Sequence, residues 1–455
     1  MIPIVTPEEM RAIDAAAPEP VEVLIDRAGA AVARLAREMM GGTYGRTVNV
    51  IAGKGNNGND GRAAAARLRE RGVRVRMFDA ADCPPRLPDA DLVIDAAYGT
   101  GFRGEWRAPR VGRAPVLAVD IPSGVDGLTG EACPGVLAAD RTVTFAALKP
   151  GLLLGAGRHL AGDVEVVDIG LDTETGPVRA SAHLVEAEDV AAWWRPRPPT
   201  AHKWSRAVRI VAGSPGMTGA AHLAAAAAQR TGSGYVALSS PGVEPSAPPE
   251  VVRRRLPAFD WAPAVLEDLH RYHALVIGPG LGREEFTVAA VRATLRDAAV
   301  PAVVDGDALF ALAWDAAGAA PVLHARREPT VLTPHDGEFG LLAGGRRPDA
   351  DRFGAVRRMA AELRCIVLLK GPSTVVAEPG GEVLVVANGD ARLATAGTGD
   401  VLSGILGALL ATKMDPFRAA AAAAWLHAEA ARRRPFNGLV AGDVVDALPG
   451  VLADL

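Results

Sequence analysis

The 455-residue sequence has only three cysteines, little excess charge and no long apolar run. Cys83, Cys133 and Cys365 lie far apart in the sequence, so neither a disulfide framework nor a zinc site is expected. The formal net charge of −4 provides no polybasic surface, which argues against nucleic acid and anionic membranes as partners.

The sequence also lacks targeting and membrane-spanning signals. Its first residues, MIPIVTPEEM, show neither the cationic start nor the apolar stretch of a signal peptide. The longest apolar stretches, near Gly404 and at Ala419–Ala424, are shorter than the about 20 residues that a spanning helix needs. A cytoplasmic location is therefore expected.

The composition is that of a globular protein, with 49% hydrophobic and 22% charged residues. A chain of this length exceeds one ordinary hydrophobic core, so two domains are expected. Proline, charged and turn-forming residues gather at 172–206, and we predict domains over residues 1–190 and 195–455.

Both halves show the pattern of α/β folds. In the first half, helix-like or loop segments separate the strand-like runs VNVIA, VRVRMF, DLVID, VLAVD, RTVTF and DVEVVDIG. The second half restarts with AVRIVAGS and continues with ALVIGPGLG, PAVVDGDAL, PTVLTPHDGE and CIVLLKGPST. This pattern predicts a Rossmann-like, doubly wound parallel sheet in the first half and a second α/β domain, each collecting ligand groups at the carboxyl ends of its strands.

A glycine-rich turn marks the first candidate site. Residues 53–58 (GKGNNG) fit G-x-G-x-x-G between a strand and a helix, which suits phosphate binding. Asp79 ends the next strand, near where a dinucleotide-dependent dehydrogenase places its ribose-binding acid. A turn that only caps a helix is the simpler alternative. However, Asn56, Asn57 and Asp60 crowd the turn with side-chain oxygens, which suit a hard cation or a polyhydroxyl ligand.

Two further acids end neighbouring strands of the first half. They are Asp95 in VIDAAYGTGFRGE and Asp120 in AVDIPSGVDGLTG. Because the carboxyl ends of parallel strands meet at one edge of a sheet, we expect these acids and the glycine-rich turn to share one crevice.

The blocks GKGNNGNDGR, DAAYGTGFRG, VDIPSGVDGLTG and TFAALKPGLLLG resemble, in order and spacing, those of NAD(P)H-hydrate epimerases. The resemblance implies that Asn57, Asp95 and Ser123 hold a potassium ion. It also implies that Asp120 contacts the substrate, and we predict acid/base work for it at the hemiaminal carbon. The other implied substrate-binding residues are Asn56, Asn57, Gly58, Asn59, Asp60, Gly99, Thr100, Gly101, Phe102, Arg103, Gly104 and Glu105.

The segment LATAGTGDVLSGIL marks the second candidate site. Gly397–Asp400 opens an apolar helix, whose positive end suits a phosphate or a developing oxyanion. Asp400 can act as a helix cap alone, or it can take a proton from a hydroxyl that is being phosphorylated.

This segment resembles the ribokinase-like superfamily, and its companion blocks follow the order of ADP-dependent NAD(P)H-hydrate dehydratases from about Ala201 onward. A fusion of this dehydratase to the epimerase is the bifunctional arrangement of the Nnr type. By resemblance, Asp400 is the catalytic base, and Ala220, Gly282 and His335 line the hydrate pocket with it. The implied adenine-nucleotide residues are Lys370, Gly371, Pro372, Ser373, Thr374 and Gly399.

The resemblance implies Mg²⁺ with ADP in the second half, and Asp305 and Asp307 are candidates for holding it through phosphates and water. The chain departs from the family pattern at four places. Asn59 replaces a glycine, Asp26–Arg27 replaces a Glu-Asn pair, Phe310 replaces an asparagine, and Trp204 replaces a glycine. The Trp204 change is predicted to alter how the entry loop folds over the substrate.

The predicted function is repair of NADH or NADPH hydrates, in which the first half interconverts the R and S forms and the second dehydrates the S form with ADP. The partners are these small molecules, and family analogy adds a homo-oligomer. A ribokinase-type small-molecule kinase with a regulatory N-terminal domain is the main alternative, and an N-terminal domain that only serves assembly is another. A dehydrogenase is weaker, because nothing in the sequence supplies its hydride-acceptor site.

Overall fold

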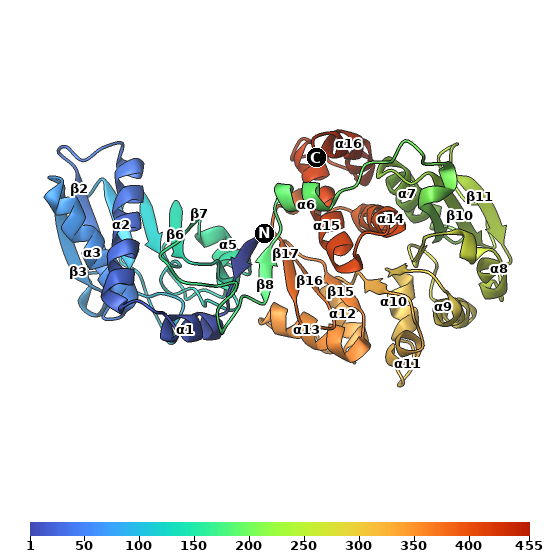
Figure 1. Cartoon of the computed structure of the whole chain (residues 1–455), viewed down its shortest axis with the longest axis horizontal. Coiled ribbons are helices and arrows are strands. Elements are labelled where there is room, and N and C mark those ends of the chain that lie inside the picture. The colour runs from blue at the N-terminus through green and yellow to red at the C-terminus, as the bar shows by residue number, and fades with distance from the viewer. The chain divides into compact units, whose positions relative to one another are not determined.

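The computed structural model describes residues 1–455, which form two compact units, Ile2–His183 and Leu184–Leu455. Each unit is a largely parallel sheet with helices packed against it, which confirms the predicted α/β class (Figure 1). None of the helices combines the length and the apolar character that crossing a membrane requires.

The N-terminal unit contains a fully parallel sheet with the strand order β3-β2-β4-β5-β6-β7. The chain adds β3 on one side of β2 and then continues with β4 on the other side, so the direction of winding reverses between β2 and β4. Ligands of such sheets bind at this reversal, beyond the carboxyl ends of the strands. The strands are β2 (Thr47–Ala52), β3 (Arg74–Asp79), β4 (Leu92–Ala96), β5 (Val116–Val119), β6 (Arg141–Phe145) and β7 (Asp163–Val167).

Alternate strand residues of this unit face two different apolar clusters. Val50, Ile94 and Val119 belong to the larger one, which also contains residues of the helices α1, α2 and α3. Val93 and Ala118 face a smaller cluster that includes Trp106 from a loop. The period of two follows from the pleat of a strand. The helices are α1 (Pro7–Ala15), α2 (Val21–Met40), α3 (Asn56–Glu70), α4 (Pro150–Leu153) and α5 (Gly157–Leu160).

The C-terminal unit contains the strand order β17-β16-β15-β14-β13-β12-β9-β10-β11. Strands β9 to β15 pair in parallel, whereas β16 pairs with β15 and β17 in antiparallel fashion. Winding reverses between β9 and β12, so a second ligand crevice is expected there. The strands are β9 (Ala207–Val211), β10 (Tyr235–Pro241), β11 (Val252–Leu256), β12 (Ala274–Ile277), β13 (Ala302–Val304), β14 (Thr330–Leu332), β15 (Ile366–Leu369), β16 (Thr374–Ala377) and β17 (Val383–Val386); two short strands, β1 (Ile2–Ile4) and β8 (Ala182–Leu184), complete the chain.

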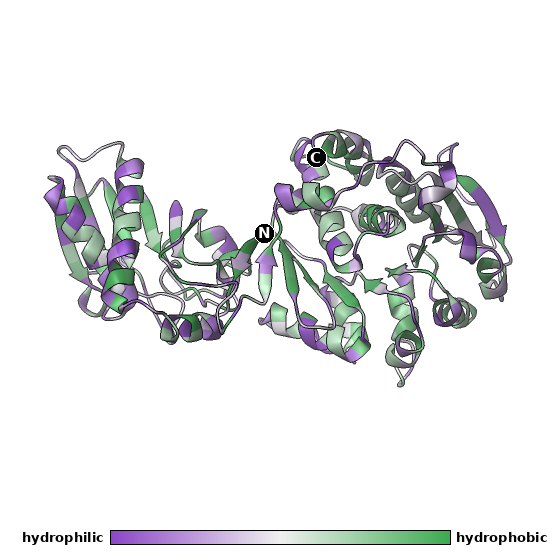
Figure 2. Ribbon diagram, in the orientation of Figure 1, coloured by the Kyte–Doolittle hydropathy of each residue, from purple (hydrophilic) through white to green (hydrophobic).

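The main core of the C-terminal unit lies between the sheet and the helices α7, α14, α15 and α16. The run Ala419–Ala424 is wholly buried in α15, which explains the alanine-rich composition as close helix packing. Figure 2 shows the apolar strands and these helices in green, whereas the edge strand β11 with Arg253–Arg255 is purple. The helices are α6 (Ala187–Trp193), α7 (Thr218–Arg230), α8 (Ala262–Leu266), α9 (Glu285–Asp297), α10 (Asp307–Leu312), α11 (Ala320–His324), α12 (Asp336–Leu342), α13 (Arg352–Leu363), α14 (Thr398–Ala411), α15 (Pro416–Arg432) and α16 (Ala441–Ala453).

Close approach of α7 and α14 depends on Gly404. A Cβ atom at this position would lie 2.1 Å from the carbonyl oxygen of Ala224. Gly404→Ala is therefore expected to lower the free energy of unfolding of this unit by roughly 1–3 kcal/mol, through overpacking. Urea unfolding checks this. Gly442→Ala, where a Cβ atom meets nothing within 4 Å, is the control and should not destabilise. Equal stability of Gly404→Ala and the unchanged chain would contradict the packing argument.

Candidate active sites

The crevice of the N-terminal unit is a cavity of about 510 Å³ at the reversal between β2 and β4. The turn after β2, the turn after β4 and Asp120 after β5 form its floor. Helices α1 and α2 form an opposite wall that includes Met10, Asp14 and Leu24. The sequence-predicted residues that line the cavity are Asn56, Asn57, Asp60, Gly99, Thr100, Gly101, Phe102 and Asp120.

The remaining predicted substrate residues of this half do not line the cavity. They are Gly58, Asn59, Arg103, Gly104 and Glu105. Gly58 instead allows two backbone segments to pack closely, because a Cβ atom there would lie 2.0 Å from the carbonyl oxygen of Gly53. Asn59 accepts a hydrogen bond from Arg62, and Arg103 pairs with Asp126.

Of the predicted cation ligands, Asp95 and Ser123 contact each other, and Asn57 lines the cavity. Ser123 Oγ donates to Asp95 Oδ1 at 2.6 Å, and the Ser123 backbone N–H donates to Asp95 Oδ2 at 3.0 Å. Burial raises the pKa of the Asp95 carboxyl, although the hydrogen bonds from Ser123 and Ala97 oppose this effect. Both amide atoms of the Asn57 side chain are buried without a hydrogen-bond partner. An unpartnered buried amide oxygen is costly, and it fits a cation site.

Asp120 is held on several sides. The Lys149 Nζ atom lies 2.8 Å from Asp120 Oδ1, and Thr144 Oγ1 donates to the same oxygen at 3.1 Å. The Thr100 backbone N–H donates to Asp120 Oδ2 at 3.1 Å. Burial disfavours the charged form, yet the Lys149 ammonium and these hydrogen bonds hold the pKa of Asp120 below its usual range. Asp120 is therefore ionised at neutral pH.

Two other carboxyl groups that line the same cavity, Asp60 and Asp14, have pKa values shifted in the opposite direction. Burial raises the pKa of Asp60 to about 8, and the charges of Asp120 and Asp14 add to this effect. Burial also raises the pKa of Asp14. The cavity thus combines the ionised Asp120 carboxylate with the Asp60 carboxyl, which is protonated at neutral pH, and such a pair is a suitable arrangement for moving protons.

Sequence reasoning missed Lys149 and Asp14. Lys149 stands inside the quoted block TFAALKPGLLLG, but nothing in the block shows that its ammonium is buried against Asp120. Asp14 belongs to α1, which carries no recognisable motif. Arg27, which departs from the family pattern, contacts two residues that line the cavity. It donates to the carbonyl oxygen of Ile169 at 2.8 Å and pairs with Glu19.

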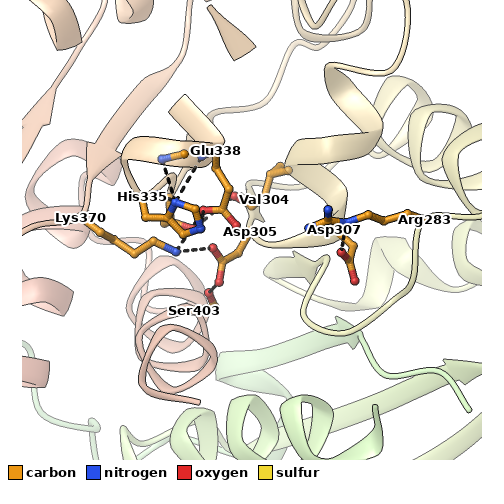
Figure 3. Close-up of polar contacts among 10 residues, drawn as sticks. Arg283, Val304, Asp305, Asp307, His335, Glu338, Lys370 and Ser403 are labelled. Atoms are coloured by element: carbon orange, nitrogen blue, oxygen red, sulfur yellow. Dashed lines mark hydrogen bonds and ion pairs between the residues drawn. The ribbon is translucent and has the colours of Figure 1, made fainter. Parts of the chain in front are cut away.

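The crevice of the C-terminal unit gathers charged side chains from the ends of β13 and β15 and from helix α12 (Figure 3). The Lys370 Nζ atom lies 2.9 Å from Asp305 Oδ1 and 3.5 Å from Glu338 Oε2. Ser403 of α14 donates to Asp305 Oδ2 at 2.7 Å. Burial raises the pKa of Asp305, but Lys370 and Ser403 outweigh it and lower the pKa overall. Lys370 itself keeps its proton, because Asp305 and Glu338 raise its pKa against the effect of burial.

The turn at Gly397 presents the amino end of α14 to this charged group. Gly397 is the N-cap residue and adopts a left-handed conformation, with φ of 93°. A Cβ atom on Gly399 would lie 3.6 Å from Lys370 Nζ, so the predicted nucleotide residues Lys370 and Gly399 are neighbours. Burial raises the pKa of Asp400 to about 7, and the negative charge of Asp305 contributes to the shift.

His335 is both a helix cap and an exposed group. Its Nδ1 atom accepts hydrogen bonds from the backbone N–H groups of Gly337 and Glu338, at 3.0 and 3.2 Å. Because Nδ1 is an acceptor, the proton of the neutral ring is on Nε2, and the side chain remains 60% exposed. These two hydrogen bonds fix the orientation of the ring but use only its Nδ1 atom.

The loop that contains Gly282 is fastened by Asp307. The Gly282 backbone N–H donates to Asp307 Oδ2 at 2.9 Å, and Arg283 pairs with Asp307 Oδ1 at 2.8 Å. The predicted pocket residue Ala220, on α7, approaches this loop at Gly280, where a Cβ atom would lie 3.1 Å from Ala220 Cβ. The segment Gly371–Thr374 joins β15 to β16 directly after Lys370.

One prediction for this half needs correction. Trp204 does not fold over the site: it stacks on Tyr235 at the amino ends of β9 and β10, whereas the site lies at the carboxyl ends. Asp305 and Asp307 each pair with a basic side chain, and their role in holding Mg²⁺ through phosphates and water stays a prediction. No group of three or more His, Cys, Asp or Glu side chains is arranged to hold a metal ion.

Comparison with known proteins finds a family model for each half of the chain. A family model described as NAD(P)H-hydrate dehydratase matches residues 208–448, and one described as YjeF-related protein N-terminus matches residues 21–88 and 78–151. A relative from Moorella thermoacetica, named bifunctional NAD(P)H-hydrate repair enzyme Nnr, is 36% identical over 99% of this chain and 97% of its own. A relative of the same name from Mycobacterium tuberculosis is 39% identical over 84% of this chain and 82% of its own. The chain belongs to this family.

A solved structure supports the ribokinase-like fold of the second half. The ADP/ATP-dependent NAD(P)H-hydrate dehydratase from Bacillus subtilis, co-crystallised with ATP and Mg²⁺, is 30% identical, with a TM-score of 0.51. The match covers 59% of this chain and 97% of that one. Family membership confirms the resemblances on which the sequence-based prediction rests and favours repair over the kinase alternative.

The raised pKa of Asp400 predicts a pH-dependent stability difference. An acid with a folded-state pKa of about 7 and an ordinary value of 3.8 stabilises the fold below pH 3.8, and this contribution disappears as pH rises through 7. Asp400→Asn carries no charge, so its stability relative to the unchanged chain should increase between pH 4 and 7, to a gain above about 1 kcal/mol at pH 8. Urea unfolding followed by tryptophan fluorescence measures this.

The exposed-site variant Asp349→Asn is the control for that measurement, since its side chain is 58% exposed. It should show no such gain. A constant difference between Asp400→Asn and the unchanged chain across this pH range would show that Asp400 is not protonated in the folded state.

Proposed function

We propose that the chain repairs hydrated nicotinamide nucleotides in two steps, with residues 1–190 as the epimerase domain and 195–455 as the ADP-dependent dehydratase domain. The first interconverts the R and S forms of NADH or NADPH hydrate, and the second returns the S form to the dinucleotide. The observation that carries the proposal is that each half holds a buried carboxylate at a strand-end crevice in a chain of this family. The two sites serve one substrate.

In the epimerase, Asp120 accepts the proton of the hydroxyl group on the hydrated ring and later returns it. Its ionised state and its place on the cavity floor suit this role. As the hydroxyl loses its proton, its oxygen forms a carbonyl and the bond between the hemiaminal carbon and the ring nitrogen breaks, with the electron pair going to the nitrogen. The nitrogen then re-forms the bond on the opposite face of the carbonyl, the proton returns from Asp120 to the oxygen, and the configuration is reversed. Asn56, Asn57, Asp60 and the turn Gly99–Phe102 line the space for the substrate.

The epimerase residues also fit a potassium ion. The buried Asp95 carboxylate has no basic partner among its hydrogen bonds, and Asn57 offers an unpartnered amide oxygen. Ser123 completes this oxygen-rich set, which a large hard cation favours. Asn57, Asp95 and Ser123 would hold the potassium ion, which would supply a positive charge beside Asp95.

In the dehydratase, Asp400 takes the proton of the ring hydroxyl while that oxygen attacks the terminal phosphate of ADP. AMP leaves, the phosphorylated hydroxyl then departs as phosphate, and loss of a neighbouring ring proton restores the dihydropyridine. A base with a pKa of about 7 is well matched to this task. Ala220, Gly282 and His335 are assigned to the hydrate pocket.

Lys370 and the amino end of α14 at Gly399 form the positive side of the nucleotide site, together with Gly371–Thr374. The side chains near this site do not form a magnesium centre by themselves. Mg²⁺ is therefore assigned to the ADP phosphates and water, in line with the relative that was crystallised with ATP and Mg²⁺. A cytoplasmic location and a homo-oligomer remain part of this proposal by analogy.

The repair reaction can be followed by the absorbance of the dihydronicotinamide ring. A mixed pool of R and S hydrates with Mg²⁺ and ADP should be converted completely. The Asp120→Ala variant should convert the S hydrate of the pool at the normal rate. It should convert the R hydrate only slowly, because that form must then epimerise without the enzyme. Asp400→Ala should convert nothing. Failure of the unchanged chain to restore absorbance, together with ATP-dependent phosphorylation of an alcohol, would support the kinase alternative.

The assigned potassium site predicts that the epimerase rate depends on which monovalent cation is present. When Li⁺ replaces K⁺ at constant ionic strength, the epimerase rate, measured by chromatographic separation of the R and S forms, should fall by roughly 10-fold or more. In Asn57→Ala the rate should be low with either cation. The internal control is dehydration of purified S hydrate, which should change with neither the cation nor the variant. An equal epimerase rate in K⁺ and Li⁺ would refute the potassium site.

A further inference from the structure

Lys149 is one of the most deeply buried side chains of the N-terminal unit, with 1% of its surface exposed. Its Nζ atom contacts three oxygens: Asp120 Oδ1 at 2.8 Å, Thr144 Oγ1 at 2.8 Å and the Phe145 carbonyl at 3.0 Å. An ammonium group has three protons to donate, so every one is used. Burying an ammonium is costly unless it is paired in this way, which fixes its position closely.

The contacts of Lys149 extend to the carboxylate that faces the cavity. Thr144 accepts a hydrogen bond from Lys149 and donates its own proton to Asp120 Oδ1. Asp120 has a φ of 68°, a left-handed conformation that few residues other than glycine adopt. Contacts outside Asp120 must therefore stabilise this backbone. Lys149 and Thr144 supply them on one carboxylate oxygen, and the Thr100 N–H supplies one on the other.

The charges around Asp120 make Lys149 the decisive partner. Asp14 on α1 and Asp60 on α3 are acids of the same cavity, and the negative charge of Asp120 raises the pKa of both. Lys149 approaches Asp120 from the segment between β6 and α4 and supplies the buried positive charge. Arg11, Glu19 and Lys54 also line the cavity, but none of them is buried. Without Lys149, three carboxyl groups would share one pocket with no buried cation.

We propose that Lys149 is a positioning residue for the epimerase reaction: with the Thr144 hydroxyl, it holds the Asp120 carboxylate ionised and aimed at the hydroxyl group of the substrate. The inference rests on the proposed function. In the reaction the hydroxyl proton moves to Asp120 and back, and Lys149 exchanges no proton with the substrate. Nothing in this arrangement requires Lys149 to touch the substrate.

The test compares the full-length chain with Lys149→Met, which keeps the length of the side chain and removes its charge. The kcat for R-to-S conversion should fall by roughly 100-fold with little change in KM. The acidic limb of the pH profile should move to higher pH, because the Asp120 carboxyl loses its ammonium partner and keeps Asp14 and Asp60 as neighbours. In Lys149→Ala, added methylamine should restore part of the rate, whereas methanol should not.

A matched pair on β6 separates positioning from general stability. Thr144→Val removes the hydroxyl that contacts Lys149 and Asp120 and should lower kcat. Thr142→Val makes the same change two residues away on a buried threonine that donates only to the Ala161 carbonyl, at 2.6 Å. It should leave the epimerase pH profile unchanged even if it lowers the melting temperature. Dehydration of S hydrate by the other half reports the concentration of intact chain.

The outcomes are distinct. If the unchanged chain does not interconvert the hydrates, the proposed function is wrong and the inference fails with it. If the unchanged chain does so and Lys149→Met retains its kcat and acidic limb, only the role of Lys149 is wrong. If Lys149→Met folds poorly, an equal loss of kcat in Thr144→Val and Thr142→Val, without amine rescue of Lys149→Ala, also overturns the inference.

Discussion

An ion pair between a lysine and a carboxylate, one of whose side chains is buried, recurs in both halves of the chain. In the first half Lys149 pairs with Asp120 at 2.8 Å, and in the second Lys370 pairs with Asp305 at 2.9 Å. Each pair joins the ends of two strands of a parallel sheet, where main-chain loops leave the sheet. A charge at such a depth is stable only with its partner, so each pair fixes the geometry of its crevice.

Each pair also sets the protonation of its neighbours. Asp60 lies near Asp120 and has a pKa of about 8, whereas Asp400 lies near Asp305 and has a pKa of about 7. Burial is the main cause in both cases, and the ionised member of the pair adds to it. Separating the pKa values of neighbouring acids lets one accept a proton while the other holds one. Both crevices therefore have acids prepared for proton transfer near neutral pH.

Glycines bring backbone close enough to build these crevices. A Cβ atom on Gly53 would lie 1.9 Å from the Ala97 carbonyl oxygen, and one on Gly278 would lie 1.8 Å from the Asp305 carbonyl oxygen. Both glycines follow the strands at which winding reverses, so any side chain would push the two ligand loops apart. The glycine-rich motifs of the sequence thus serve the shape of the sheet edge as well as the approach of a phosphate.

The sequence by itself determined the α/β class, the motif blocks, the strand-end acids Asp95 and Asp120 and the helix-start acid Asp400, because apolar runs and their flanking glycine and aspartate residues are local patterns. It could not show which motif residues face the crevice: Gly58 and Asn59 lie within the motif, but they do not line the cavity. Nor could it show that Trp204 lies at the opposite end of the strands from the site. The pairing of Lys149 with Asp120 and of Lys370 with Asp305 was decided only in the tertiary structure, because residues 29 and 65 positions apart meet there through the sheet order. Burial, which sets their charge states, is likewise a property of the fold.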